Sequence, residues 1–379
     1  MSIHGGTRDG ARQLGRPPVA IVHDYLTQHG GAERVVLTMA EAFPEAAVHT
    51  SFYDPDGTFP AFFEHRVRTQ PINRIGPLRS HPRAALPLLA ASFSRELIDA
   101  DVVLCSSSGW AHGVLTTGRK VVFCYTPARW LYQGDRYLGD RPRPVARTAL
   151  ALLAPPLRRW DRRSAASADR YLVTSTEVRR RVQQRYRRDA EVIPPPPAIG
   201  AEHPRRPLER IEPGYWLCVS RFLAYKHVDA VVEAFAALPG ERLVLVGTGP
   251  QEAALRASAG PNVTVAGRVD DDELAWLYAN CQAVVLASHE DYGLVPLEAA
   301  GFGRPAVVLE WGGFLDTVVP GSTGLFFPDP TPTAIRDAVA RAGGVPWSEK
   351  EIVAHASRFS RERFVQRLRA VVAEESDLV

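Results

Sequence analysis

The chain has 379 residues, of which 45% are hydrophobic and 23% charged, and this composition is typical of a soluble protein with two globular domains. The formal net charge of +3 is too small to indicate a nucleic-acid partner. No apolar run reaches the roughly 18 residues of a membrane span, and residues 1–18 lack the apolar core of a signal peptide, which predicts a flexible leader.

The first half of the chain alternates short β-branched runs with amphipathic patterns. This alternation predicts a parallel sheet covered by helices. We expect strands at residues 19–23, 101–107, 120–126 and 170–175, and helices at residues 32–43 and 177–186. The prolines Pro194–Pro197 fix φ and forbid a helix, so they predict a stiff connector that ends a first domain spanning residues 1–197.

The second half repeats the pattern and predicts a second domain over residues 198–357. Its expected strands are residues 215–221, 241–247, 262–267, 283–288 and 305–311, and its expected helices are residues 227–238, 251–258, 270–281 and 295–302. A final amphipathic helix over residues 358–379, with Phe359, Phe364, Leu368 and Val371 or Val372 near helical spacing, is expected to pack on the first domain. The sequence therefore predicts two doubly wound α/β domains, whose ligands lie at the carboxyl ends of the strands.

The four cysteines indicate a reducing compartment. They stand alone in mostly apolar surroundings, with neither a CxxC spacing nor a histidine at metal-ligand spacing: Cys105, Cys124, Cys218 and Cys281. We expect buried thiols in a cytoplasmic protein that is at most peripheral to the inner face of a membrane. We expect no metal site and no cofactor.

An anion site is predicted where the strand at 283–288 leads into the helix at 295–302. Pro296 lies in the first turn of that helix, where its missing N–H costs nothing. The free backbone amides before it, together with the positive end of the helix dipole, can hold a phosphate. These amides belong to Gly293, Leu294 and Val295.

Two glutamates flank this predicted phosphate site, with seven residues between them. Glu298 lies in the first turns of the helix, where its carboxylate could accept both hydroxyls of a ribose, and Glu290 in the preceding loop would meet a sugar. As an isolated pattern, such a pair is more often a helix-start acid and a surface charge. Arg221 and Lys226 change the balance, because they follow another strand at the same sheet edge and could clamp a diphosphate.

Four segments of the second half, in this order and spacing, resemble the retaining glycosyltransferases of family four, which have the GT-B fold. They are VSRFLAYKHVDAVVEAF, LVLVGTGPQEAALRA, NVTVAGRVDDDELAWLYANC and HEDYGLVPLEAAGFGRPAVV. The likeness is specific over residues 215–327 and looser in the first half. It implies two Rossmann-like domains that face each other across a cleft, and transfer of a sugar from a nucleotide-diphosphate donor with retention of configuration and without a metal ion.

The resemblance also assigns residues by position. Arg221 and Lys226 match the family's diphosphate-binding pair, Glu290 its sugar-contacting glutamate and Glu298 its ribose-contacting glutamate. The backbone at Arg268 and Val269 matches the place of the base. In the first domain, HGGAERVV resembles the family's glycine-rich loop, which implies a role for Gly30 and Gly31 beside the donor phosphates or the acceptor.

The segment KVVFCYTPARWLYQ resembles a subgroup that includes many mannosyltransferases using GDP-mannose. In that subgroup a strand ends in His-Thr-Pro, followed by an arginine, which Arg129 matches here. Tyr125 stands where the histidine is expected, and its hydroxyl could still donate a hydrogen bond at the reacting sugar. His23, Asp24 or His112 could approach from neighbouring loops, although each of them alone is more often structural.

Arginine is concentrated in residues 158–188 and should make a positive surface. A solvated arginine-rich face and an anionic membrane or phosphate partner have equal weight here. The stretch RTALALLAPPLRRWDRR could lie on a membrane, but a helix packed on its own domain is slightly favoured.

The function that the residues and the resemblance together favour is transfer of a hexose to a hydroxyl acceptor, and the resemblance implies mannose from GDP-mannose foremost. The acceptor itself is not named by the sequence, and a lipid-linked or cell-surface saccharide is one candidate. A nucleotide-sugar sensor or assembly subunit without activity is an alternative, for which Tyr125 is the only support in the sequence. A sugar-nucleotide epimerase on the same fold is a third possibility.

Overall fold

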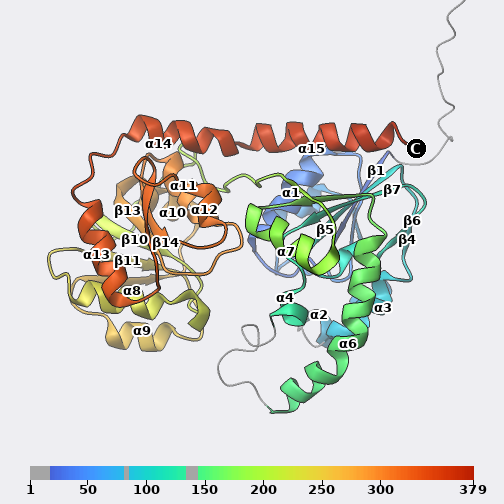
Figure 1. The fold of residues 1–379 in the computed structure, drawn as a ribbon, viewed down its shortest axis with the longest axis horizontal. Coiled ribbons are helices and arrows are strands. Elements are labelled where there is room, and N and C mark those ends of the chain that lie inside the picture. The colour runs from blue at the N-terminus through green and yellow to red at the C-terminus, as the bar shows by residue number, and fades with distance from the viewer. Residues whose placement is uncertain (1–17, 81–84, 134–143) are drawn as a thin grey trace, which may run out of the picture.

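The structure is a computed structural model that describes residues 18–80, 85–133 and 144–379, in which two α/β domains are connected by a linker (Figure 1). The first 17 residues, including most of the predicted leader, lie outside the described part. Within that part, no helix is both long and apolar enough to cross a membrane.

The N-terminal domain is built on a parallel sheet in the order β3-β2-β1-β5-β7-β8-β9. Its strands are β1 (Val19–His23), β2 (Val48–Thr50), β3 (Val67–Thr69), β5 (Val102–Ser107), β7 (Arg119–Cys124), β8 (Arg170–Val173) and β9 (Glu191–Val192). Its helices are α1 (Gly31–Ala42), α2 (Gly76–Ser80), α3 (Leu86–Phe93), α4 (Arg129–Tyr132), α6 (Pro144–Ala166) and α7 (Thr176–Tyr186). Short 3₁₀ turns η1 (Pro60–Glu64), η2 (Pro71–Arg74) and η4 (Ala111–Gly113) and a small pair, β4 (Leu97–Ile98) with β6 (Leu115–Thr116), complete it.

Both faces of this sheet are buried, which explains why its strands are continuous apolar runs. Along β5, Val102 and Leu104 enter one core cluster, while Val103 and Cys105 enter the other. Such two-sided burial is the usual condition of a parallel sheet covered by helices. The predicted strands and helices of this half are therefore found, and the short strands β2, β3 and β9 extend the sheet beyond the prediction.

The C-terminal domain repeats the arrangement with the parallel order β12-β11-β10-β13-β14-β15. Its strands are β10 (Tyr215–Val219), β11 (Leu243–Val246), β12 (Val263–Gly267), β13 (Cys281–Leu286), β14 (Ala306–Leu309) and β15 (Gly324–Phe327). Its helices are α8 (Val228–Ala236), α9 (Glu252–Ser258), α10 (Asp271–Asn280), α11 (Leu294–Gly301), α12 (Phe314–Thr317), α13 (Pro332–Ala342) and α14 (Glu349–Ala356), with turns η5 (Ala224–Lys226) and η6 (Ser357–Phe359). This is the strand order of a Rossmann sheet.

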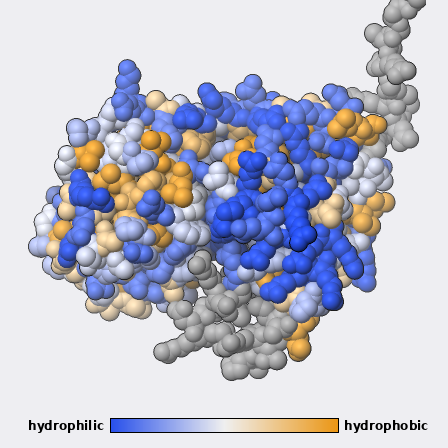
Figure 2. All heavy atoms as spheres, in the orientation of Figure 1, coloured by the Kyte–Doolittle hydropathy of each residue, from blue (hydrophilic) through white to orange (hydrophobic). Residues whose placement is uncertain are grey.

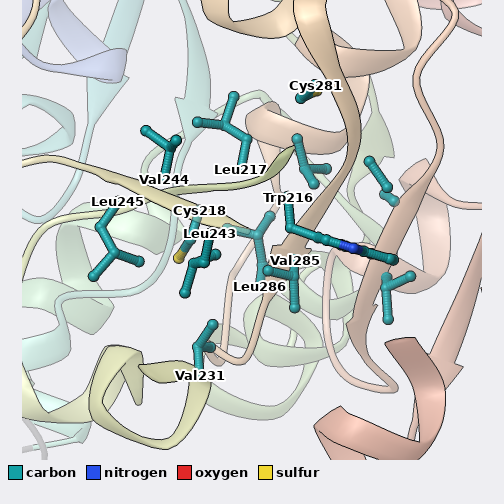
Figure 3. Packing of buried hydrophobic residues seen from close by; sticks show 14 of the residues in the cluster. Trp216, Leu217, Cys218, Val231, Leu243, Val244, Leu245, Cys281, Val285 and Leu286 are labelled. Carbon is teal, nitrogen blue, oxygen red and sulfur yellow. The ribbon is translucent and has the colours of Figure 1, made fainter. Parts of the chain in front are cut away.

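The core of the C-terminal domain is packed from β10, β11, β13 and α8, and Figure 3 shows side chains of all four elements in this cluster. Trp216 on β10 is almost fully buried there and stacks edge-on against Phe235 of α8. The cysteines Cys218 and Cys281 lie in the same core, and Cys105 and Cys124 in that of the other domain, so all four are buried free thiols as expected.

The last helix, α15 (Arg361–Ser376), leaves the C-terminal domain and packs on the N-terminal one, as predicted (Figure 1). Phe364, Leu368 and Val371 are buried in the N-terminal core, where Phe364 meets Phe123 of β7 edge-on. Arg367 also donates to Glu191 of β9. The chain therefore crosses between its domains twice, at the linker and before α15.

Candidate active site in the interdomain cleft

A cavity of about 470 Å³ lies between the two domains, and this volume is in the range of small-molecule sites. Its walls come from segments that follow the carboxyl ends of β1, β5, β7, β8, β10, β13 and β14. In open parallel sheets this is the edge where ligands bind. The lining residues that carry polar or glycine chemistry include Asp24, Gly31, Tyr125, Thr126, Arg129, Arg221, Glu290, Asp291 and Gly293.

The N-terminus of α11 lies in this cavity, and the three residues of the predicted anion site, Gly293, Leu294 and Val295, all line it. Gly293 caps the helix with φ +89°, a left-handed conformation that glycine adopts without strain. A Cβ on Gly293 would also crowd the ring of Phe314. The first amides of a helix have no partner inside the helix, so this terminus presents donors to the cavity.

The N-terminus of α1 faces α11 from the opposite domain. Gly31 lines the cavity, and a Cβ added there would lie 3.5 Å from Cδ1 of Leu294. Gly30 does not line the cavity and instead caps α1 in an extended conformation. Two positive helix ends therefore converge on one space, which favours a negatively charged ligand.

Lys226 and Glu290 are brought together as a direct ion pair. Glu290 lines the cavity and also accepts from the hydroxyl of Ser288 at 2.8 Å, whereas Lys226 is buried behind it and does not line the cavity. Burial would raise the pKa of Glu290, but the charge of the ammonium and the hydrogen bonds outweigh it, so its pKa lies below the usual value. Glu290 is therefore held ionised at the wall of the cavity.

Arg221 lines the cavity from the loop after β10, where it is exposed and donates to the hydroxyl of Tyr225 at 3.1 Å. Of the two predicted cations, the structure therefore places the exposed Arg221 at the cavity and the buried Lys226 behind Glu290. The predicted pair is at the expected sheet edge, but its two members are in different environments.

Glu298 is placed differently from the other predicted donor residues. It is buried, accepts from the Tyr278 hydroxyl at 2.7 Å and from the Ala198 amide at 3.4 Å, and does not line the cavity. Burial raises its pKa above the usual value. Arg268 and Val269 follow β12 and also lie outside the cavity lining.

On the N-terminal side, Tyr125 lines the cavity, and its hydroxyl lies 3.0 Å from Oγ of Ser106 and donates to the Ala32 carbonyl at 3.1 Å. Burial raises the pKa of this phenol. His23 stands behind it, with Nδ1 3.0 Å from Oγ of Ser106, and is absent from the cavity lining. Tyr125 is thus fixed at the base of the α1 terminus.

Asp24 and His112 are structural in this arrangement. The Asp24 carboxylate accepts three backbone amides, those of Ser108, Trp110 and Ala111 at 2.6 to 3.0 Å, so it shapes the loop after β5 although it borders the cavity. His112 is buried away from the cavity lining, with Nδ1 2.9 Å from Oγ of Ser107. Neither His23 nor His112 therefore lines the cavity.

Arg129 lines the cavity, but its partner was missed by the sequence reasoning. Its guanidinium binds Asp291 of the opposite domain, with Nε 3.0 Å from Oδ2. Arg181 of α7 binds the other oxygen of Asp291 at 2.6 Å. The position of Asp291 directly after Glu290 was the one available signal, but nothing in a single sequence pairs it with arginines more than 100 residues away.

The chain matches two family models. Residues 29–196 match the model described as Glycosyltransferase Family 4, and residues 213–342 match the one described as Glycosyl transferases group 1. Among curated proteins, the D-rhamnosyltransferase WbpZ of Pseudomonas aeruginosa is 32% identical over 234 residues, which are 58% of this chain and 60% of the relative.

Two further relatives match shorter segments. The O-antigen chain mannosyltransferase C of Escherichia coli is 34% identical over 113 residues, 27% of this chain and 30% of the relative. The GDP-mannose-dependent alpha-(1-6)-phosphatidylinositol dimannoside mannosyltransferase of Mycobacterium tuberculosis is 29% identical over 192 residues, 47% of this chain and 50% of the relative. The chain thus spans 60% or less of the length of these three relatives.

Solved structures with the same fold cover nearly the whole chain. The sucrose-phosphate synthase of Thermosynechococcus elongatus superposes with a TM-score of 0.71 at 20% identity, covering 95% of this chain and 99% of that one. The Anabaena protein HepE, in complex with UDP and glucose, gives a TM-score of 0.67 at 16% identity and covers 94% and 100%. The two domains thus have the GT-B arrangement that the sequence predicted.

Proposed function

We propose that this chain, a GT-B glycosyltransferase with the two domains of family 4 and group 1, moves a hexose from a nucleotide-diphosphate sugar to a hydroxyl acceptor. The proposed donor is GDP-mannose, and the proposed transferred sugar is mannose. The support for this choice is that two of the curated relatives are named as mannosyltransferases and one of them as GDP-mannose-dependent.

The observation that carries the proposal is the convergence of positive groups on one interdomain cavity. Two helix N-termini meet there, Arg221 lines its wall, and Lys226 stands behind Glu290. A diphosphate that leaves the sugar develops negative charge, and donors fixed in advance around it lower the barrier. Glu290, ionised at the same wall, would orient the hydroxyls of the sugar.

The proposed chemistry retains configuration and uses no protein nucleophile. The acceptor oxygen would enter on the face from which the diphosphate leaves, so that a phosphate oxygen takes the acceptor proton. The hydrogen bonds of Asp24 support this route. Its carboxylate accepts from three backbone amides, so it is poorly placed to take a proton from the acceptor. We keep Glu298 as the proposed partner of the ribose, which requires it to exchange its bond with Tyr278.

The experiment is a thermal-shift screen with GDP, UDP, ADP and dTDP sugars, followed by a transfer assay with the best donor. A ligand at about 100 times its Kd stabilises the folded state by about 2.7 kcal/mol, which is readily measured. Transfer to an acceptor supports the proposal. Tight donor binding without turnover over a broad acceptor panel would instead support the sensor, and an altered sugar nucleotide formed without acceptor would support the epimerase.

We also propose a peripheral membrane contact through the arginine-rich segment. Figure 2 shows a hydrophilic face over α7, and its exposed arginines include Arg179, Arg180, Arg185 and Arg187. On α6, Leu152 is 73% exposed, while Trp160 is packed on its own domain, where it donates to Ser94. The predicted packing of this helix on its own domain is therefore found, and Leu152 and its neighbour Leu153 remain exposed to contact another surface.

Vesicle sedimentation tests this contact. Binding to vesicles with anionic phosphatidylglycerol should exceed binding to neutral phosphatidylcholine, because each basic residue near such a surface contributes about 1 kcal/mol. Leu152→Asp should weaken the binding, whereas Leu378→Asp, at a leucine that is 66% exposed near the C-terminus, should not. Equal binding to both vesicles, or none, would contradict the proposal.

A further inference from the structure

A chain of four charged side chains connects the two domains beside the cavity. Glu177 and Arg181 come from α7, Asp291 from the loop between β13 and α11, and Arg129 from α4. Nε of Arg181 lies 2.9 Å from Glu177, and its Nη1 lies 2.6 Å from Asp291, whose second oxygen holds Arg129. Positive and negative charges alternate along the chain, so each carboxylate has a guanidinium partner.

The loop that carries Asp291 is held at several further points. The hydroxyl of Ser175, in the N-terminal domain, donates to the Asp291 carbonyl. The next residue, Tyr292, donates from its hydroxyl to the carbonyl of Pro195 in the linker at 2.8 Å. Arg181 also lies over the ring of Trp311 in the C-terminal domain, 5.5 Å from its centre. The loop therefore takes its position from the opposite domain and the linker as much as from its own.

We propose that Asp291 is a positioning residue: clamped by Arg129 and Arg181, it fixes the loop that presents Glu290 only when the two domains are closed on each other. These three residues are called the interdomain latch. The proposal rests on the proposed function for its effect on the rate, but its effect on the loop does not depend on any activity.

The physical reason is the burial of the charges. Arg181 is 8% exposed and Asp291 is 7% exposed, so removing the carboxylate takes one of its two carboxylate partners from a buried guanidinium and leaves it beside the guanidinium of Arg129. The contact is ionic rather than apolar, so water can replace each partner when the cleft opens. Interfaces between domains that move relative to each other have this polar character.

The latch also has a free end in the cavity. Arg129 donates to Asp291 from Nε and Nη2, and within the described residues no protein group accepts from its Nη1. Its side chain is 35% exposed and lines the cavity. Asp291 would thus hold a guanidinium with one edge ready for a ligand oxygen, which is a second way in which it acts through other groups.

The variant Asp291→Asn tests the latch, because it removes the charge and keeps the size of the side chain. Asp271→Asn is the matched control, since Asp271 also binds an arginine of the other domain, Arg34 at 2.7 Å. It lies on α10, away from the loop between β13 and α11. The first measurement is hydrogen exchange of the amides of residues 288–293 in the ligand-free protein. Exchange should become about tenfold faster in Asp291→Asn and stay unchanged in the control.

The second measurement is steady-state kinetics with the donor found by the screen. The contacts of the diphosphate on α11 and after β10 belong to one domain and do not need the latch. The backbone that presents Glu290 is held by the latch in addition to the bonds of its carboxylate to Lys226 and Ser288. We expect kcat to fall at least about tenfold, the equivalent of about 1.4 kcal/mol, with the Kd of the nucleoside diphosphate changed by less than about threefold. The control should change neither.

Unchanged exchange in residues 288–293, or an equal effect of Asp271→Asn, would overturn the latch. If Asp291→Asn does not fold, Arg129→Gln gives the same test, because this arginine is partly exposed and its loss should still release the loop. If the wild type transfers no sugar, the proposed function fails, and the exchange result decides the latch by itself.

Discussion

Replacing Lys226 by methionine tests the electrostatic basis of the proposed reaction. Methionine keeps the apolar stem and the packing but removes the ammonium, whose side chain is 9% exposed and paired with Glu290. A diphosphate on the α11 amides would lie on the far side of Glu290 from the ammonium. At an effective dielectric constant of about 20, two unit charges at about 6 Å interact by about 3 kcal/mol.

An interaction of this size, fully expressed in the transition state, corresponds to a rate effect of about 100-fold. Loss of one fixed donor to a developing anion costs about 100- to 1000-fold in other enzymes, which agrees with the electrostatic figure. We therefore expect kcat/KM of Lys226→Met to fall about 100-fold while the melting temperature shows a folded protein. Lys350→Met, at an exposed lysine on α14, is the control and should retain full activity.

The same variant has a consequence for pH. Lys226 keeps the pKa of Glu290 low, so in the wild type this pair contributes stability above the unfolded pKa of 4.5 and loses it as pH falls through the folded value. Without the ammonium this acid-side loss should shrink. Turnover of Lys226→Met close to that of the wild type, measured with saturating acceptor, would refute the electrostatic reasoning.

Two further substitutions probe buried positions next to the site. Glu298 has a raised pKa in the folded state, so its contribution to stability is complete below pH 4.5 and is lost as pH rises through the folded pKa. In urea titrations, the stability of Glu298→Gln relative to the wild type should therefore increase from pH 4 to pH 8. The affinity of this variant for the donor should fall. A larger relative gain at pH 4 would contradict this sign. A Cβ on Gly313 would overlap the backbone of Tyr292, so Gly313→Ala should destabilise the protein by about 1 to 3 kcal/mol. Gly240→Ala, where no atom lies within 4 Å of the added Cβ, should differ little in melting temperature, and equal shifts in the two variants would refute the steric argument.

The sequence predicted the sheets well because their strands are buried on both faces. Runs such as 102–105 and 283–286 are apolar at every position, and this pattern survives without knowledge of their neighbours. The strands β2 and β3 were missed because they have three residues each and lie toward the edge of the sheet, where such runs carry little pattern.

For the site, sequence reasoning located the loops better than the side chains. Arg221 and Glu290 could be assigned to one edge because carboxyl ends of parallel strands meet there. The three amides on Asp24 and the hydroxyl of Tyr278 on Glu298 could not be foreseen, because they depend on how loops fold back over their own domain. The pairing of Asp291 with Arg129 and Arg181 depends on how two separately folded domains face each other, which no local pattern encodes.

The return of α15 to the N-terminal domain limits how the molecule can move. A body tethered by a single flexible strand can swing in any direction, but one tethered at two separate points can only pivot about the line through them. The connection at Pro194–Pro197 and the turn before Arg361 define such a line. The interdomain cleft should therefore open by rotation of the domains about this line, with the largest displacement at the edge farthest from α15.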